Sequence, residues 1–389
     1  MTEPARFLAP ARRGIYVHIP FCARKCHYCD FNSYALDRAA VRSFLRALDA
    51  EIALYAREAG DEPFDTLSLG GGTPTCLSGR DLSGLVRRIT AAFPFREDAE
   101  ITCEANPGSS NAEKFAALRE AGVNRLSLGA QSFDDGLLRA LGRDHSAGDV
   151  VESVRAAREA GFDNLNLDLM FALPGQSLAQ WEATLEAALE LRPEHLSCYS
   201  LIIEEGTPFG ELHARGKLSL PGEETERAMF DAARVRLAAA GYVHYEISNF
   251  AFPGRESRHN QLYWRIEPYL GLGPGAHGHW NGVRYANVRL PSDYAALVEA
   301  GKKPVEESRP VPLEEEMEDV LVFGMRLLGG VERGRFRERF GIDVLEAYPR
   351  EVERLRAKGL LEVTEEVVRL TREAVPVANQ VFVEFLRSR

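Results

Sequence analysis

Residues 14–29 read GIYVHIPFCARKCHYC, and this stretch decides the fold and the chemistry expected for the chain. Its first six residues are predicted to form a strand, and three cysteines follow in a Cys-x3-Cys-x2-Cys pattern. Thiolates are soft ligands that suit iron–sulfur clusters. A cluster of four irons would then have one iron without a protein ligand. Cys22, Cys26 and Cys29 therefore predict a [4Fe–4S] cluster with one position open to a small molecule.

A zinc site is the alternative for the same cysteines. Structural zinc takes four ligands, and His18 and His27 are the nearby candidates for the fourth position. The spacing differs from that of a paired zinc knuckle, which disfavours zinc. The other cysteines, Cys76, Cys103 and Cys198, stand alone and are not expected to form disulfides in a reducing compartment.

The region from residue 14 to about residue 201 alternates short apolar runs with amphipathic helical stretches. Helices are expected over residues 37–59, with Asp37 as the cap, and over residues 81–93. Five further strands are expected in FDTLSLGGG, EITCEANPG, NRLSLGAQS, NLNLDLMFALPG and HLSCYSLI. These runs are apolar at nearly every position, as in a parallel sheet covered on both faces. The pattern predicts an α/β fold with a partial barrel of six strand–helix units, whose chemistry gathers at the C-terminal ends of the strands.

The remainder of the chain is less regular. A helix is expected over residues 223–240 and one strand in YVHYEISNFA. After Pro291, three helices, a hairpin in LLEVTEEVVRLT and a last helix predict a smaller, mainly helical, winged-helix-like module. The expected boundary lies near residue 290, which divides the chain into a core domain, 1–290, and a C-terminal domain, 291–389.

Composition excludes several classes of protein. The chain has 389 residues, 45% of them hydrophobic, and a formal net charge of −11. The acidic balance disfavours a protein that tracks nucleic acid through phosphate contacts. No apolar run approaches the roughly 20 residues that span a bilayer, and the N-terminal residues contain no signal-peptide stretch. A cytoplasmic protein without a membrane span is therefore expected.

The cysteine loop after the first strand of a β/α barrel resembles the signature of radical S-adenosylmethionine enzymes. The segments YVHIPFC, residues 16–22, and CDF, residues 29–31, resemble the corresponding segments of the oxygen-independent coproporphyrinogen oxidase group. Within that group they are most similar to those of HemW-type haem chaperones. The similarity runs from residue 14 to the C-terminal module. It implies that the open iron binds the amino and carboxylate groups of S-adenosylmethionine, which an electron from the cluster cleaves to a 5′-deoxyadenosyl radical.

Polar residues and glycines near the ends of the expected strands are candidates for holding this cofactor. Glycines let the backbone approach a ligand, and a carboxylate can accept hydrogen bonds from a ribose or an ammonium group. Taken singly, each residue could be only a turn, a cap or a surface group. By resemblance, the cofactor contacts are Tyr16, Tyr28, Gly71, Gly72, Thr73, Glu104, Gln131, Arg143 and Asp168.

A second group, His259, Tyr263 and Trp264, lies in the string HNQLYW. Aromatic faces stack on a flat macrocycle, and imidazole is a common ligand of haem iron. The alternative is that the aromatic residues pack in the core and that His259 bonds a carbonyl. By resemblance, the His-Asn-x-x-Tyr-Trp string is associated with haem binding in the chaperone branch. His277 and His279 are alternative iron ligands.

Two functions share this barrel and cluster. The resemblance favours a haem chaperone that binds haem as cargo and passes it to acceptor haemoproteins. The alternative is an oxygen-independent coproporphyrinogen III oxidase, and a related radical methyltransferase is a third possibility. Phe31 stands where the oxidases carry a fourth cysteine, and only about 13 residues precede the first strand, which favours the chaperone without that oxidase activity. If the cofactor is cleaved, a flavodoxin or ferredoxin is expected as the electron donor.

Overall fold

The computed structural model describes residues 12–387. Residues 1–11, where the sequence predicts no signal peptide, lie outside the described part. The largest element is one sheet of twelve strands. Its six central strands run parallel and in chain order, and they are β1 (Gly14–Ile19), β4 (Phe64–Gly71), β5 (Phe95–Ala105), β6 (Arg125–Gln131), β7 (Leu165–Phe171) and β8 (His195–Ser200). This arrangement confirms the predicted partial barrel of six strands.

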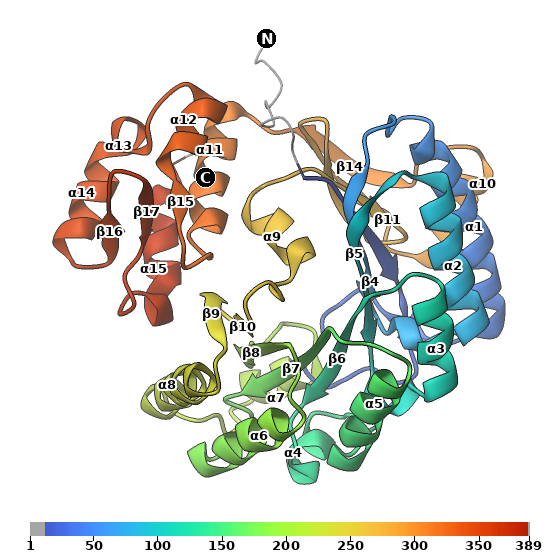
Figure 1. Ribbon diagram of the computed structural model, residues 1–389. Coiled ribbons are helices and arrows are strands. Elements are labelled where there is room, and N and C mark those ends of the chain that lie inside the picture. The colour runs from blue at the N-terminus through green and yellow to red at the C-terminus, as the bar shows by residue number, and fades with distance from the viewer. Residues whose placement is uncertain (1–11, 388–389) are drawn as a thin grey trace.

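Helices connect these strands and cover the outer face of the curved sheet (Figure 1). The first begins after Asp37, whose carboxylate accepts the N–H of Ala40 at 2.8 Å, as the sequence predicts. Its inner face buries Phe44 and Leu48 completely, and burial of a side chain of this kind contributes about 1.5–3 kcal/mol. The covering helices are α1 (Arg38–Ala56), α2 (Gly79–Ala92), α3 (Ala112–Glu120), α4 (Asp135–Ala140), α5 (Ala147–Glu159) and α6 (Leu178–Glu190).

Beyond β8 the chain forms α7 (Pro208–Ala214), α8 (Glu223–Ala239) and a hairpin of β9 (Val243–Glu246) and β10 (Asn249–Ala251). The prediction of one continuous strand over YVHYEISNFA is therefore wrong. The buried carboxylate of Glu246 accepts the backbone N–H of Ser248 at 2.9 Å and bonds the side-chain amide of Asn249. These bonds reverse the chain at a place where no glycine or proline indicates a turn.

The sheet also continues on the other side of β1. There β11 (Tyr269–Leu272) runs parallel to β1, followed by the antiparallel strands β12 (His277–Trp280), β13 (Val283–Asn287) and β14 (Val305–Pro310). Helix α10 (Pro291–Glu299) packs against α1, and its Tyr294 belongs to the hydrophobic core of the barrel. Val305 packs against the core of the barrel, whereas Met317 packs against a second hydrophobic core.

The C-terminal module has its own hydrophobic core. Pro349 begins a new helix, so the third predicted helix is divided in two. The module contains α11 (Leu313–Gly324), β15 (Val331–Glu332), α12 (Arg333–Phe340), α13 (Val344–Ala347), α14 (Pro349–Ala357), β16 (Leu361–Val363), β17 (Val367–Leu370) and α15 (Ala378–Phe382). Helix α9 (Arg258–Trp264) lies between this module and the sheet (Figure 1).

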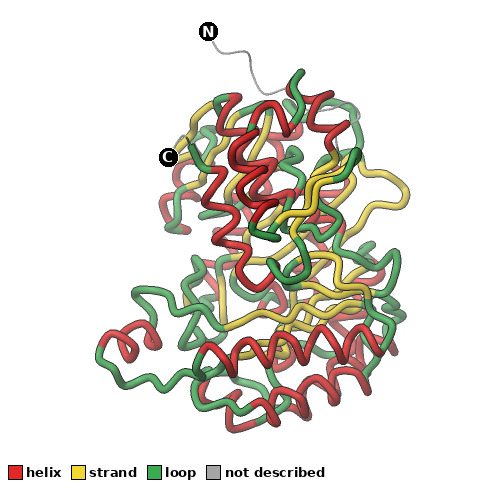
Figure 2. The backbone as a smooth tube through the Cα atoms, turned by 90° about the vertical axis from the view of Figure 1, so that its left-hand side faces the viewer, coloured by secondary structure: helices red, strands yellow, loops and turns green. Residues whose placement is uncertain are grey.

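Figure 2 shows the face on which the module lies, with the module in the upper half and the strands and helices of the barrel below it.

Among residues 12–387, no helix is both long and apolar enough to cross a membrane.

Candidate metal and cofactor site

A cavity of about 430 Å³ lies at the C-terminal ends of the parallel strands. Its walls come from the cysteine loop and from the ends of β4, β5, β6, β7 and β8. This is the edge of the sheet where the sequence places the chemistry. The structure brings these predicted residues together around the cavity: Cys22, Cys26, Tyr28, Cys29, Gly71, Gly72, Thr73, Glu104, Gln131, Arg143 and Asp168.

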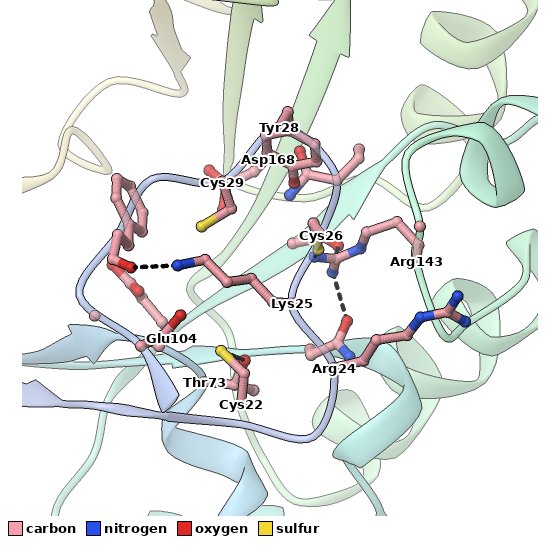
Figure 3. A pocket seen from close by; sticks show the side chains of 18 of the residues that line it. Cys22, Arg24, Lys25, Cys26, Tyr28, Cys29, Thr73, Glu104, Arg143 and Asp168 are labelled. Carbon is pink, nitrogen blue, oxygen red and sulfur yellow. Dashed lines mark hydrogen bonds between the residues drawn. The ribbon is translucent and has the colours of Figure 1, made fainter. Parts of the chain in front are cut away.

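The cysteine loop is anchored on both sides. At its start and end, the two-residue strands β2 (Phe21–Cys22) and β3 (Tyr34–Ala35) pair in parallel. In its middle, the backbone N–H of His27 donates to Leu141 at 2.9 Å, and the carbonyl of His27 accepts the N–H of Phe209 at 3.0 Å. Figure 3 shows the loop carrying all three cysteines around Lys25. The loop is thus held both by the pairing of its own two ends and by hydrogen bonds to neighbouring elements.

Two side chains from the barrel contact the cysteine sulfurs. Arg143 donates from Nη1 to Sγ of Cys26 at 3.3 Å, and Oγ1 of Thr73 lies 3.5 Å from Sγ of Cys22. Arg143 is itself oriented, because its Nη2 donates to Oδ1 of Asn106 at 2.5 Å and to the carbonyl of Gly129 at 2.7 Å (Figure 3). Hydrogen bonds to sulfur are among the means by which a protein adjusts an iron–sulfur cluster.

The chemistry of these donors fits an iron–sulfur cluster. Within residues 12–387, no three His, Cys, Asp or Glu side chains lie close enough to share a single metal ion. Burial, chiefly, raises the pKa of Cys29, and metal binding must displace that proton.

The glycine turn after β4 is required by packing. Gly71 has φ +105°, and a Cβ there would lie 2.6 Å from the ring of His18. A Cβ on Gly72 would lie 2.5 Å from the carbonyl oxygen of Phe21. Close packing therefore explains both glycines without a ligand.

Two carboxylates, Glu104 and Asp168, enter the cavity from neighbouring regions of the sheet. Burial, with a further contribution from the charge of Asp168, raises the pKa of Glu104 to about 7. Asp168 is held by Ser127 Oγ at 3.1 Å and by the amide of Asn166 at 2.8 Å. Asn166 in turn accepts from Nδ1 of His195 at 2.6 Å, so a chain of hydrogen bonds below the cavity orients Asp168.

Sequence reasoning missed two cavity residues near strand ends, Asn106 and Tyr199, although it identified Gln131. Gln131 ends β6 with φ +64°, a strained conformation for glutamine, and its Oε1 accepts from Tyr199 at 2.9 Å. Tyr199, near the end of β8, and Asn106, just after β5, both line the cavity. Their position at strand ends is the signal that could have identified them. Arg143 lies in the turn between α4 and α5.

A second cavity of about 580 Å³ adjoins the first and shares four lining residues with it: Asp30, Phe31, Gly71 and Glu104. Tyr16 and Tyr263 line only this second cavity. Phe31, which is 61% exposed, lines both cavities. Phe31 is thus an exposed aromatic residue between two cavities.

The predicted haem residues on α9 face three different environments. His259 is 2% exposed, and its ring is bonded to Oγ1 of Thr66 at 2.6 Å and to the hydroxyl of Tyr263 at 2.8 Å. Tyr263 reaches the second cavity. Trp264 packs against the C-terminal module, where it stacks on Phe323 with a centroid distance of 6.4 Å. The structure therefore does not bring these three side chains to one surface.

Comparisons with known proteins agree with this geometry. The Radical SAM superfamily matches residues 16–188, and the HemN C-terminal domain matches residues 311–377. A solved structure, titled coproporphyrinogen III oxidase (HemN) from Escherichia coli, a radical SAM enzyme, superposes with a TM-score of 0.85 at 23% identity, over 97% of this chain and 91% of that one. The fold and the site thus define a radical SAM protein.

Relatives narrow the assignment. The chain is 42% identical to the heme chaperone HemW of Bacillus subtilis, over 96% of this chain and 99% of that protein. It is 44% identical to the heme chaperone HemW of Escherichia coli, over 68% of this chain and 69% of that protein. The chain belongs to the HemW family.

Proposed function

We propose that this chain binds haem and passes it to acceptor haemoproteins in the cytoplasm. The observation that carries the proposal is the 42% identity, across 96% of the chain, to a relative named for haem chaperoning. The likeness to the oxidase HemN, at 23% identity, concerns the fold alone. Phe31 at the place of the oxidases' additional cysteine supports the chaperone over coproporphyrinogen III oxidation.

In this proposal Cys22, Cys26 and Cys29 hold a [4Fe–4S] cluster, and an exchangeable S-adenosylmethionine binds beside it. When bound, the cluster supplies an electron and an iron with an open coordination position. The guanidinium of Arg143 donates a hydrogen bond to Sγ of Cys26.

The remaining cavity residues bind and orient the cofactor. The carboxylates of Glu104 and Asp168 would attract its positive charges. Gly71, Gly72 and Thr73 would allow it to approach the backbone at the end of β4. Tyr28, Gln131 and Arg143 line the same cavity, and Tyr16, which lines the adjoining cavity, completes the proposed contact set.

The haem contacts proposed on α9 are His259, Tyr263 and Trp264, of which Tyr263 reaches a cavity directly. The hydroxyl of Tyr263 is hydrogen-bonded to His259, so a substitution of His259 would alter how Tyr263 is held at the second cavity. Should S-adenosylmethionine be cleaved, a flavodoxin or ferredoxin would supply the electron.

Haem titration and a product assay test the proposal together. Protein purified without oxygen is titrated with haemin, and the loaded protein is mixed with apomyoglobin as a model acceptor. A shifted Soret band, followed by formation of holomyoglobin faster than from free haemin, supports the proposal. In parallel, coproporphyrinogen III, S-adenosylmethionine and a reductant are added. Formation of protoporphyrinogen would favour the oxidase instead, and failure to bind haem would reject the chaperone.

A further inference from the structure

The second cavity offers one histidine that is free to bind a metal. A haem iron needs an imidazole nitrogen that is not already bonded. The rings of His18 and His259 each make two hydrogen bonds through both nitrogens. His279 is buried, at 3% exposure, and does not line the cavity. His277 is exposed and lines the cavity, and in the described part of the chain no side chain or backbone group bonds its ring.

We infer that His277 supplies the axial nitrogen ligand to the iron of a haem held in the second cavity. The inference rests on the proposed haem-binding function and deepens it by naming the cavity and the ligand. The volume of about 580 Å³ lies within the range of about 300–1,000 Å³ that is usual for small-molecule and cofactor sites.

The surroundings of His277 suit a flat ligand. In β12 it is paired with Ala286 of β13, so its neighbour on the same face is only a methyl group. On the other side β11 approaches closely, because a Cβ on Gly271 would lie 1.9 Å from the carbonyl oxygen of His277. Side chains stand roughly perpendicular to a sheet, so the imidazole projects between two small residues. A porphyrin plane can therefore approach its nitrogen without a clash from either neighbour.

Aromatic rings surround the same space. Tyr16, Tyr263, Tyr269 and Phe31 all line the cavity, and the rings of Tyr263 and Tyr269 meet edge to face at a centroid distance of 4.8 Å. Aromatic faces and edges are the usual contacts of a macrocycle.

The charges at the rim favour a ligand that can leave. Arg289 is exposed on the rim and offers a guanidinium to one haem propionate. The carboxylates of Asp30, Glu306 and Glu307 line the same cavity and oppose the second propionate. A site with one imidazole ligand leaves the other face of the iron for a ligand from the acceptor, which suits transfer rather than storage.

The test compares single variants of the full-length protein by haemin titration and electron paramagnetic resonance. We expect His277→Ala to lose the electron paramagnetic resonance signal of imidazole-ligated iron and to bind haemin about tenfold or more weakly. Added imidazole should restore this signal. His277→Met should bind haemin with an altered axial ligand. His213→Ala is the matched control, because His213 is an exposed histidine on α7 that lines neither cavity, and it should behave as the unaltered protein.

The outcomes separate the two proposals. An unaltered protein that binds no haemin would reject both the proposed function and this inference. If the unaltered protein binds haemin and His277→Ala keeps the same spectrum and affinity, the inference about His277 is wrong while haem binding stands. A loss confined to His259→Ala would likewise overturn it in favour of the α9 histidine.

Discussion

Replacing Glu104 with glutamine should weaken binding of S-adenosylmethionine and remove most of its pH dependence. Glutamine keeps the shape of the side chain but removes the charge that would accept hydrogen bonds from the cationic cofactor. A hydrogen bond to a charged group contributes about 1.5–3 kcal/mol, so affinity at pH 8 should fall about 10- to 150-fold. Because the pKa of Glu104 is raised to about 7, the carboxylate is about one-tenth ionised at pH 6 and about nine-tenths ionised at pH 8. Affinity in the unaltered protein should therefore rise about tenfold across this interval.

Equilibrium dialysis with labelled S-adenosylmethionine at pH 6, 7 and 8 measures both effects on protein that carries its cluster. Glu205→Gln is the control, because Glu205 is exposed and lines neither cavity. Its affinity should match that of the unaltered protein at each pH. If Glu104→Gln binds the cofactor within twofold of the unaltered protein, with the same pH profile, Glu104 is not a cofactor contact.

Three further predictions concern the cluster and the fold. Cys22→Ala should lose the cluster, measured as iron and sulfide per chain, whereas Cys76→Ala should keep it; a full cluster in Cys22→Ala would reject that ligand. Glu51 is fully buried and its pKa is raised to about 7, so its ionisation should lower stability by up to about 3 kcal/mol from pH 5 to pH 8; a fall that is no smaller in Glu51→Gln would contradict this origin. Glu316 forms a buried ion pair with Arg339, and Glu316→Ala should cost about 3–5 kcal/mol in chemical unfolding; a cost below 1 kcal/mol would show that the pair is not desolvated.

The parallel part of the fold could be predicted because each strand is a short apolar run followed by a helical pattern. The antiparallel additions could not. Glu246 makes the turn between β9 and β10 by accepting bonds from Ser248 and Asn249, and a turn that depends on a buried carboxylate leaves no glycine or proline in the sequence. Strand β14 reads VEESRP and is mostly exposed, so it lacks the apolar pattern that indicates a strand.

The candidate site could be predicted where a residue ends a parallel strand, because the strand direction determines the edge at which it lies. Glu104 and Gln131 were identified in this way. The direction in which a side chain on a helix points could not be predicted from the sequence in this way. His259 and Tyr263 are one turn apart on α9, yet the ring of His259 is buried against Thr66 while Tyr263 reaches a cavity. That difference depends on how α9 docks in the barrel, where Glu100 accepts its first backbone N–H groups.

Mössbauer spectroscopy of protein reconstituted with enriched iron tests the central claim most directly. Three thiolates, from Cys22, Cys26 and Cys29, would leave one iron of a four-iron cluster different from the other three. The account predicts that S-adenosylmethionine changes the signal of this one iron and leaves the remaining three nearly as they were. If S-adenosylmethionine changed the Mössbauer signal of none of the irons, or if zinc were found in place of iron, the result would contradict the account.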